Sequence, residues 1–174
     1  PNIDETGSTI RGNVGYAQPP HLFRKTGNGK FRDGATEVAG GFDKPKVGRG
    51  LACGDFDRDG DLDILMTTNN GPAYLFRNDV ASGNRGIRVR LIGTKSNRDA
   101  IGATVRIFYN GQSQSRMVRG GSSYLSQSEL SVTFGVCQRD TLDRLPTPWP
   151  SAKSDAHKNL STSNSLQPHQ PTGV

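Results

Sequence analysis

The feature that most constrains this chain is a nine-residue window with an aspartate at every second position. Its sequence is Asp55-Phe56-Asp57-Arg58-Asp59-Gly60-Asp61-Leu62-Asp63. Carboxylates so close together repel one another, and a bound cation removes that repulsion. The acids occupy positions 1, 3, 5, 7 and 9 of a loop in which Gly60 permits a sharp bend. The window therefore predicts a cation-binding loop.

The donor set of this loop favours Ca²⁺. Calcium takes about six to eight oxygen ligands in a flexible shell, whereas Mg²⁺ retains several of its waters. We expect carboxylates from positions 1, 3, 5 and 9 and a backbone carbonyl from position 7, so the side chain of Asp61 is the weakest candidate. A solvated acidic turn is the alternative without a metal. The predicted ligands are Asp55, Asp57, Asp59, Asp61 and Asp63.

The loop does not fit an EF-hand. That motif requires Glu at position 12 and a helix on each side. Position 12 here is Met66, and the flanking residues 50–54 and 64–68 have the composition of strands. We therefore expect the loop to join two β-strands.

The rest of the chain has the frequent turn residues that are typical of an all-β protein. Its 22 glycines and 10 prolines leave no long stretch with helical periodicity. A Gly27-Asn28-Gly29 turn predicts a strand and return strand within residues 22–31. The Asn110-Gly111 pair predicts a hairpin that joins residues 103–109 to 112–118. Further strands are expected at residues 64–68, 73–77, 87–91 and 131–134.

The organisation of the chain changes near residue 85. Leu75-Phe76-Arg77 repeats Leu22-Phe23-Arg24 at a distance of 53 residues, about the length of a propeller blade. Prolines 146, 148 and 150 argue against a central strand, and residues 151–174 are rich in Ser, Asn, Gln and Pro. We predict an irregular lead-in at residues 1–20, a repeat region at 21–84, a β domain at 85–150 and a low-complexity tail at 151–174.

Two parts of the chain resemble known families. Residues 54–65 resemble the calcium loop of FG-GAP/VCBS repeats, the blades of integrin-α-type β-propellers. Residues 22–31 and 75–78 resemble the stretch that closes such a blade. Residues 93–103 and 119–128 resemble the ASPIC/UnbV domain, which follows such repeats in many secreted bacterial proteins.

This resemblance implies an all-β fold: one or two partial β-propeller blades with a calcium loop, a small antiparallel β-sandwich-like domain, and an irregular C-terminal tail. It also implies a secreted or cell-surface protein that binds Ca²⁺. Such propellers have about seven blades, so we expect a C-terminal fragment of a larger protein. The family usually carries Trp-Pro-Ser-Gly after its last strands, whereas Ala152 here follows Trp149-Pro150-Ser151.

The charge of the chain leaves its partner open. The formal net charge is +6, although five of the 16 acids lie in the acidic window. Basic residues on the predicted strands make a polyanion an alternative partner, as does an acidic protein. We rank acidic polysaccharide ahead of nucleic acid because no nucleic-acid-binding motif occurs. The arginines concerned are Arg88, Arg90, Arg106, Arg116 and Arg119.

Other function classes have weaker support. No apolar run reaches the roughly 18 residues of a membrane span, and Cys53 and Cys137 allow at most one disulfide. Ser113 lies in a Gly-x-Ser segment that lacks the second glycine of a hydrolase nucleophile turn. We predict a non-enzymatic, calcium-binding interaction or adhesion module. A calcium-dependent hydrolase of phosphate or carboxylic esters is the main alternative, because clustered carboxylates can hold a catalytic metal.

Overall fold

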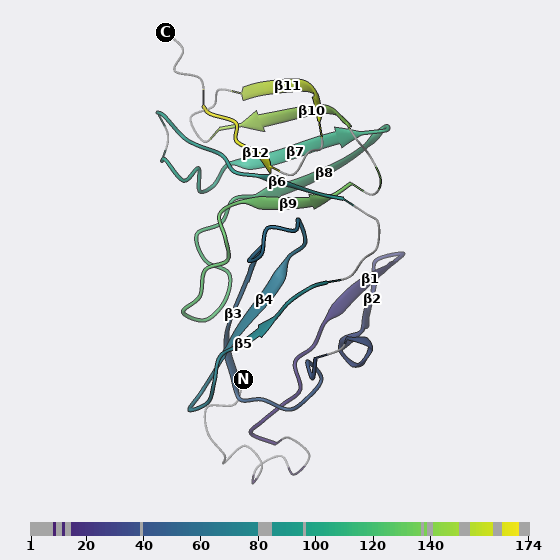
Figure 1. The fold of residues 1–174 in the computed structure, drawn as a ribbon, viewed down its shortest axis with the longest axis vertical. Helices are drawn as coiled ribbons and strands as arrows, with labels where there is room; N and C mark the ends of the chain where they lie inside the picture. Colours follow the sequence, from purple (N-terminus) through teal and green to yellow (C-terminus); the bar gives the residue numbers. More distant parts are fainter. Residues whose placement is uncertain are drawn as a thin grey trace. The chain divides into compact units, whose positions relative to one another are not determined.

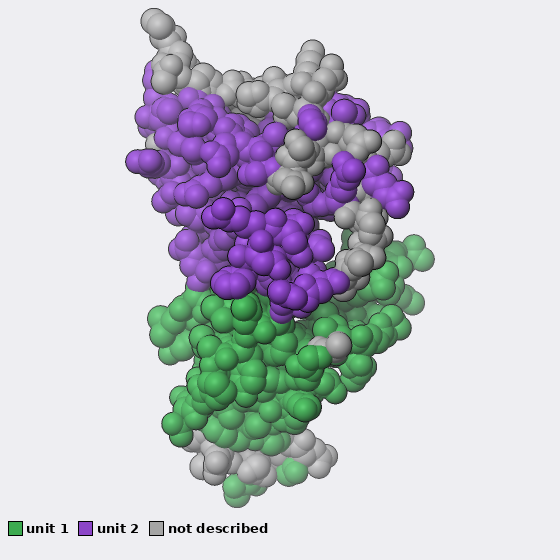
Figure 2. All heavy atoms as spheres, in the orientation of Figure 1, with its two compact units in different colours: residues 1–52, 64–76, 123–126 green, residues 53–63, 77–122, 127–174 purple. Residues whose placement is uncertain are grey.

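A computed structural model describes residues 9, 12, 15–38, 40–79, 85–95, 97–136, 138, 141–149, 154–161 and 165–170. The fold is all-β, as the sequence predicts (Figure 1). The chain divides into two compact units, coloured separately in Figure 2. Unit 1 holds residues 1–52, 64–76 and 123–126, and unit 2 holds residues 53–63, 77–122 and 127–174. No helix of the described residues is long and apolar enough to cross a membrane.

Unit 1 contains a hairpin and a three-stranded sheet. The hairpin pairs β1 (Phe23–Gly27) with β2 (Lys30–Asp33), and the 3-10 helix η1 (Ala35–Glu37) follows it. Asn28 and Gly29 have φ angles of 49° and 73°, the left-handed conformation that tight hairpin turns require. The turn predicted there is therefore confirmed.

The three-stranded sheet of unit 1 has the order β3 (Gly48–Gly54), β4 (Asp63–Thr68), β5 (Tyr74–Phe76). The ends of β3 and β4 that flank the acidic loop, Cys53–Gly54 and Asp63, are assigned to unit 2. Among the described residues of unit 1, the buried hydrophobic side chains are Ala35, Phe42 and Met66. The described part of the unit therefore has a small core.

Unit 2 is a two-sheet structure. One antiparallel sheet has the order β11 (Ser154–Ser161), β10 (Thr141–Pro148), β7 (Thr104–Tyr109), β8 (Gln112–Met117). The other has the order β12 (Ser165–Leu166), β6 (Gly86–Val89), β9 (Val132–Gly135), and β12 runs parallel to β6. Both sheets contribute to a single cluster of buried side chains. This cluster includes Val105 and Ile107 of β7 and Phe134 of β9, each at 0% exposure.

The β7–β8 hairpin follows the predicted pattern. Its register runs from Thr104↔Met117 to Tyr109↔Gln112. Asn110 and Gly111 at the turn have φ angles of 49° and 73°. On β7, buried Val105 and Ile107 alternate with exposed Arg106, because successive side chains of a strand point to opposite faces.

The C-terminal region differs from the sequence prediction. An irregular tail was expected at residues 151–174, but β11 and β12 lie within this range. Gln170, at 2% exposure, accepts hydrogen bonds at Oε1 from the backbone N–H groups of Thr94 (3.1 Å) and Lys95 (2.9 Å). Gln170 thus satisfies the backbone N–H groups of residues 94 and 95. The polar composition of the C-terminal segment does not reveal this structural role.

The sequence predicted that alternate prolines would exclude a central strand, but β10 contains two of them and lies between β11 and β7. Pro146 and Pro148 pair with Ala156 and Ser154 of β11. In an antiparallel ladder, residues two apart direct their N–H groups to the same edge, so alternate prolines interrupt one edge only. On its other side β10 pairs with β7, where Arg144 lies opposite Phe108.

The two cysteines cannot be compared in this structure. Cys53 carries a free thiol, and burial raises the pKa of this thiol. Cys137 lies outside the described residues. The disulfide that the sequence allows between them is therefore not formed in this structure.

Candidate metal centre

The acidic loop connects the end of β3 to the start of β4, as predicted. Its backbone turns sharply at Arg58 and Gly60, whose φ angles are 64° and 100°. The carboxylate of Asp57 accepts a hydrogen bond from the N–H of Asp59 (3.3 Å), and that of Asp59 accepts one from the N–H of Asp61 (2.9 Å). Such Asx turns fix short acidic side chains against their own loop.

Three of the predicted ligands converge. Asp55, Asp57 and Asp59 each offer a carboxylate oxygen, and the three oxygens lie within 4.8 Å of one another. Oδ1 of Asp55 is buried and has no hydrogen-bond partner among the described residues. A buried carboxylate oxygen without a partner is costly. A small hard cation would satisfy it, so the residues present fit a calcium ion.

The pKa of Asp61 reflects its burial and the repulsion among the loop carboxylates. Burial raises the pKa of its carboxyl most, and the charges of the four other loop aspartates raise it further. The charged form of Asp61 is therefore less favourable in this loop than in water when no positive charge is present. This is the electrostatic state that a bound cation relieves.

Asp63 occupies a different position from the other four acids. It is 2% exposed. Its Oδ2 accepts a hydrogen bond from the N–H of Phe56 (2.8 Å), and its Oδ1 accepts one from the N–H of Asn78 (2.9 Å). Asp63 therefore ties the start of the loop to the segment that follows β5.

Sequence reasoning missed the contribution of this segment. The sequence predicted a strand at residues 73–77 and a blade-closing stretch at 75–78, but no contact of this segment with the loop. In the structure the N–H of Asn78 donates to Asp63, and Arg77 lies near Asp57. Nε of Arg77 lies 2.8 Å from Oδ1 of Asp79 and 3.9 Å from Oδ2 of Asp57. The hydrogen bond to Asp79, and more weakly the loop charges, raise the pKa of Arg77. The only sequence signal for this contribution was the repeated Leu-Phe-Arg segment, since its second copy ends at Arg77, one of the residues that lie near the loop.

The arginines that the sequence places on predicted strands do not form one surface. Arg88 donates from Nε to Oε2 of Glu129 (3.0 Å), so its charge is paired. Arg106 lies opposite Ser115 and Arg116 lies opposite Val105. Because neighbouring residues on a strand alternate between faces, Arg106 and Arg116 project from opposite faces of the β7–β8 hairpin.

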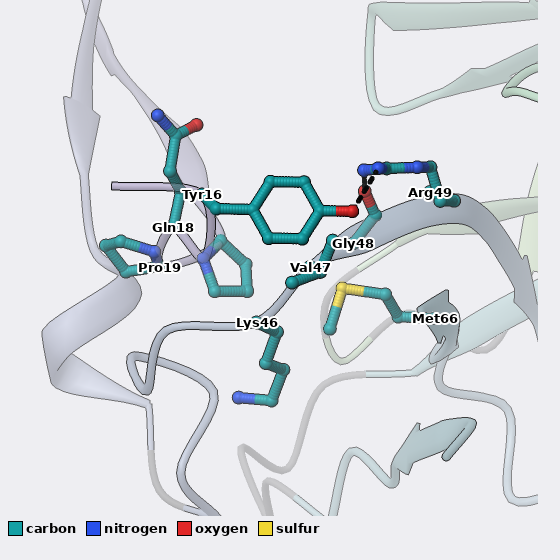
Figure 3. Close-up of a pocket in the computed structure, with 9 residues that line it drawn as sticks. Tyr16, Gln18, Pro19, Lys46, Val47, Gly48, Arg49 and Met66 are labelled. Atoms are coloured by element: carbon teal, nitrogen blue, oxygen red, sulfur yellow. Dashed lines mark hydrogen bonds between the residues drawn. The ribbon is translucent and has the colours of Figure 1, made fainter. Parts of the chain in front are cut away.

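A small hollow in unit 1, of about 150 Å³, lies beside Tyr16 (Figure 3). The Tyr16 hydroxyl accepts hydrogen bonds from Nη2 of Arg49 (3.3 Å) and Nδ2 of Asn69 (2.9 Å). Nζ of Lys46, also in the wall, donates to the carbonyl of Gly41 (2.6 Å). The Tyr16 hydroxyl and the Lys46 ammonium are thus engaged within unit 1, and the acidic loop is the stronger candidate site.

Comparison with known proteins gives two family matches. The model described as "FG-GAP-like repeat" matches residues 12–66, and the model described as "ASPIC and UnbV" matches residues 93–173.

The chain is also similar to cartilage acidic protein 1 of three animals. The Mus musculus protein is 44% identical over 66 residues, which cover 37% of this chain and 10% of that protein. The Homo sapiens protein is 45% identical over 58 residues, 33% of this chain and 9% of that protein. The Xenopus tropicalis protein is 40% identical over 77 residues, 44% of this chain and 11% of that protein. The chain therefore matches about a tenth of the length of these relatives.

Proposed function

We propose that this chain, in which an FG-GAP-like repeat is followed by an ASPIC/UnbV domain, is a calcium-binding, non-enzymatic interaction module of an extracellular protein. The observation that carries the proposal is the convergence of three carboxylates, one of which has a buried oxygen without a hydrogen-bond partner among the described residues. FG-GAP repeats generally bind calcium, which supports the choice of metal. Similarity to proteins named for cartilage supports an extracellular location.

The loop residues have separate tasks in this proposal. Asp55, Asp57 and Asp59 hold the ion with their carboxylates. Asp63 can add a ligand oxygen without losing its backbone bonds, since each carboxylate oxygen has two lone pairs. Asp61 contributes its backbone carbonyl. Bound calcium supplies positive charge, which cancels the repulsion that raises the pKa of Asp61.

The ion's role is structural in this account. It stabilises the folded chain by mass action, by about 2.7 kcal/mol at a free concentration 100 times the dissociation constant. The loop thereby holds β3 and β4 in a fixed connection. A folded chain of this kind presents a surface to a partner, which we propose to be a protein or an acidic polysaccharide at the cell surface.

Isothermal titration calorimetry tests the proposal. We expect one saturable Ca²⁺ site in the wild-type chain and a loss of affinity of at least about tenfold in Asp59→Asn, because a charged ligand becomes neutral. Asp43→Asn removes one exposed carboxylate outside the loop and is the matched control, with unchanged binding expected.

Two results would contradict the proposal. The first is no saturable binding up to about 10 mM Ca²⁺, ten times the weakest range of extracellular sites. The second concerns the non-enzymatic role: turnover of phosphate or carboxylic esters that disappears in Asp59→Asn while the fold is retained.

A further inference from the structure

A second polar site lies in unit 2, and none of the three converging carboxylates is in its wall. It is a groove of about 390 Å³ along β8, β9 and the segment that joins them. Two arginines, Arg116 and Arg119, contribute to its wall together with Glu129 and Thr133. Nothing in the calcium proposal uses these residues.

The two arginines provide unpaired positive charge. Both are exposed, and neither forms an ion pair with a described residue. The guanidinium of Arg116 lies 5.6 Å from the ring centroid of Phe134, which is fully buried. Stacking on a buried ring restrains the arginine while its N–H edge stays available, so less entropy is lost when it binds an anion.

The negative charge in the groove is already compensated. Arg88 contacts Oε2 of Glu129 through both Nε and Nη2. Oε1 of Glu129 and Oγ1 of Thr133, however, are buried and have no hydrogen-bond partner among the described residues. Because Glu129 is charge-paired, its free oxygen requires a hydrogen-bond donor rather than a second cation. A ligand hydroxyl, or a water that it holds, provides that donor.

The remaining wall offers a small apolar surface. Leu62 and Met117 line the groove and are 39% and 50% exposed. A fitting ligand therefore combines an anionic group, several hydroxyls and a C–H face. Acidic sugars have all three. Nucleic acid fits less well because single strands bind through aromatic stacking, and the described residues of this wall include no aromatic side chain.

We propose that the groove binds an acidic saccharide, with its carboxylate or sulfate on Arg116 and Arg119 and its hydroxyls toward Glu129 and Thr133. The proposal deepens the interaction role proposed above and rests on it. It does not require the calcium loop to be occupied.

The test measures binding of a heparin-derived tetrasaccharide to the full chain by calorimetry. The titration is done once in calcium and once in chelator. We expect saturable binding in both buffers and a loss of about tenfold in Arg119→Gln or Arg116→Gln, since each removes a charge-assisted hydrogen bond. Arg106→Gln is the matched control, because it makes the same change on the opposite face of the hairpin. Its affinity should equal that of the wild type.

Thr133→Val separates binding from folding. The change removes a hydroxyl that has no partner, so the melting temperature should stay the same or rise. Affinity for the tetrasaccharide should nevertheless fall by roughly threefold, the value of one neutral hydrogen bond.

Five outcomes would overturn the groove proposal. The first three are no binding by the wild type, wild-type affinity in Arg119→Gln and Thr133→Val, and an equal loss in Arg106→Gln. The other two are equal binding of a thymidine octanucleotide and equal binding of a neutral maltotetraose, which should not bind. Failure of the calcium proposal is distinguished by its own readout, the Ca²⁺ titration of the same protein without saccharide.

Discussion

Asp57 and Asp63 lie in one acidic loop, yet their carboxylates have opposite relations to the folded chain. Asp63 is buried and accepts two backbone N–H groups. Asp57 is partly exposed and faces other carboxylates. The alternating sequence identifies both as acids of a cation loop, but it cannot separate them, because the partner N–H of Asn78 comes from another segment.

These differences predict opposite effects of the same substitution in metal-free protein. In chelator, Asp63→Asn should lower the free energy of unfolding by about 1–3 kcal/mol, since its amide NH₂ faces a backbone N–H without an acceptor. Asp57→Asn should leave stability unchanged or raise it, because it removes like-charge repulsion. Urea denaturation measures both. Equal destabilisation by the two variants would contradict this division of roles.

Arg77 should weaken calcium binding, because its guanidinium stands 3.9 Å from a predicted ligand, Asp57. We expect Arg77→Gln to raise Ca²⁺ affinity by about two- to fivefold, as fits an exposed ion pair. Arg24→Gln is the matched control, since Arg24 holds the equivalent place in the repeated Leu-Phe-Arg segment. Calorimetry compares the three proteins, and unchanged or lower affinity in Arg77→Gln would show that Arg77 has no such effect.

At the scale of elements, local turn chemistry made the hairpins predictable. The Gly27-Asn28-Gly29 and Asn110-Gly111 turns adopt the left-handed angles that their sequences favour. The elements that sequence reasoning missed, β10 to β12, depend on distant partners instead. Pro146 lies within the pairing of β10 with β11, opposite Ala156. Gln170 is buried because residues 94 and 95 offer it N–H groups.

A pair of glycine substitutions isolates the contribution of turn conformation. A Cβ at Gly111 or at Gly135 would meet no atom within 4 Å, but only Gly111 has a left-handed φ, 73°. Gly111→Ala should therefore destabilise the chain by about 1 kcal/mol, and Gly135→Ala should have a smaller effect. Chemical denaturation of the two variants measures the difference, and a larger loss in Gly135→Ala would contradict this explanation.

For the whole molecule, the two units differ in how much apolar surface they bury. The described residues of unit 2 share one core cluster of 14 buried side chains, whereas those of unit 1 bury Ala35, Phe42 and Met66. The described part of unit 1 thus buries few apolar side chains. We expect calcium bound at the acidic loop to matter for the stability of the chain.

The melting temperature of the wild-type chain, measured in saturating calcium and in chelator, tests the central claim most directly. At 100 times the dissociation constant, calcium should raise the melting temperature by roughly 5–10 °C, since about 1 kcal/mol corresponds to roughly 2–4 °C at this size. Asp59→Asn should show little or no rise at the same concentration. A wild-type melting temperature that is the same in calcium and in chelator would contradict the claim that the acidic loop is a calcium site.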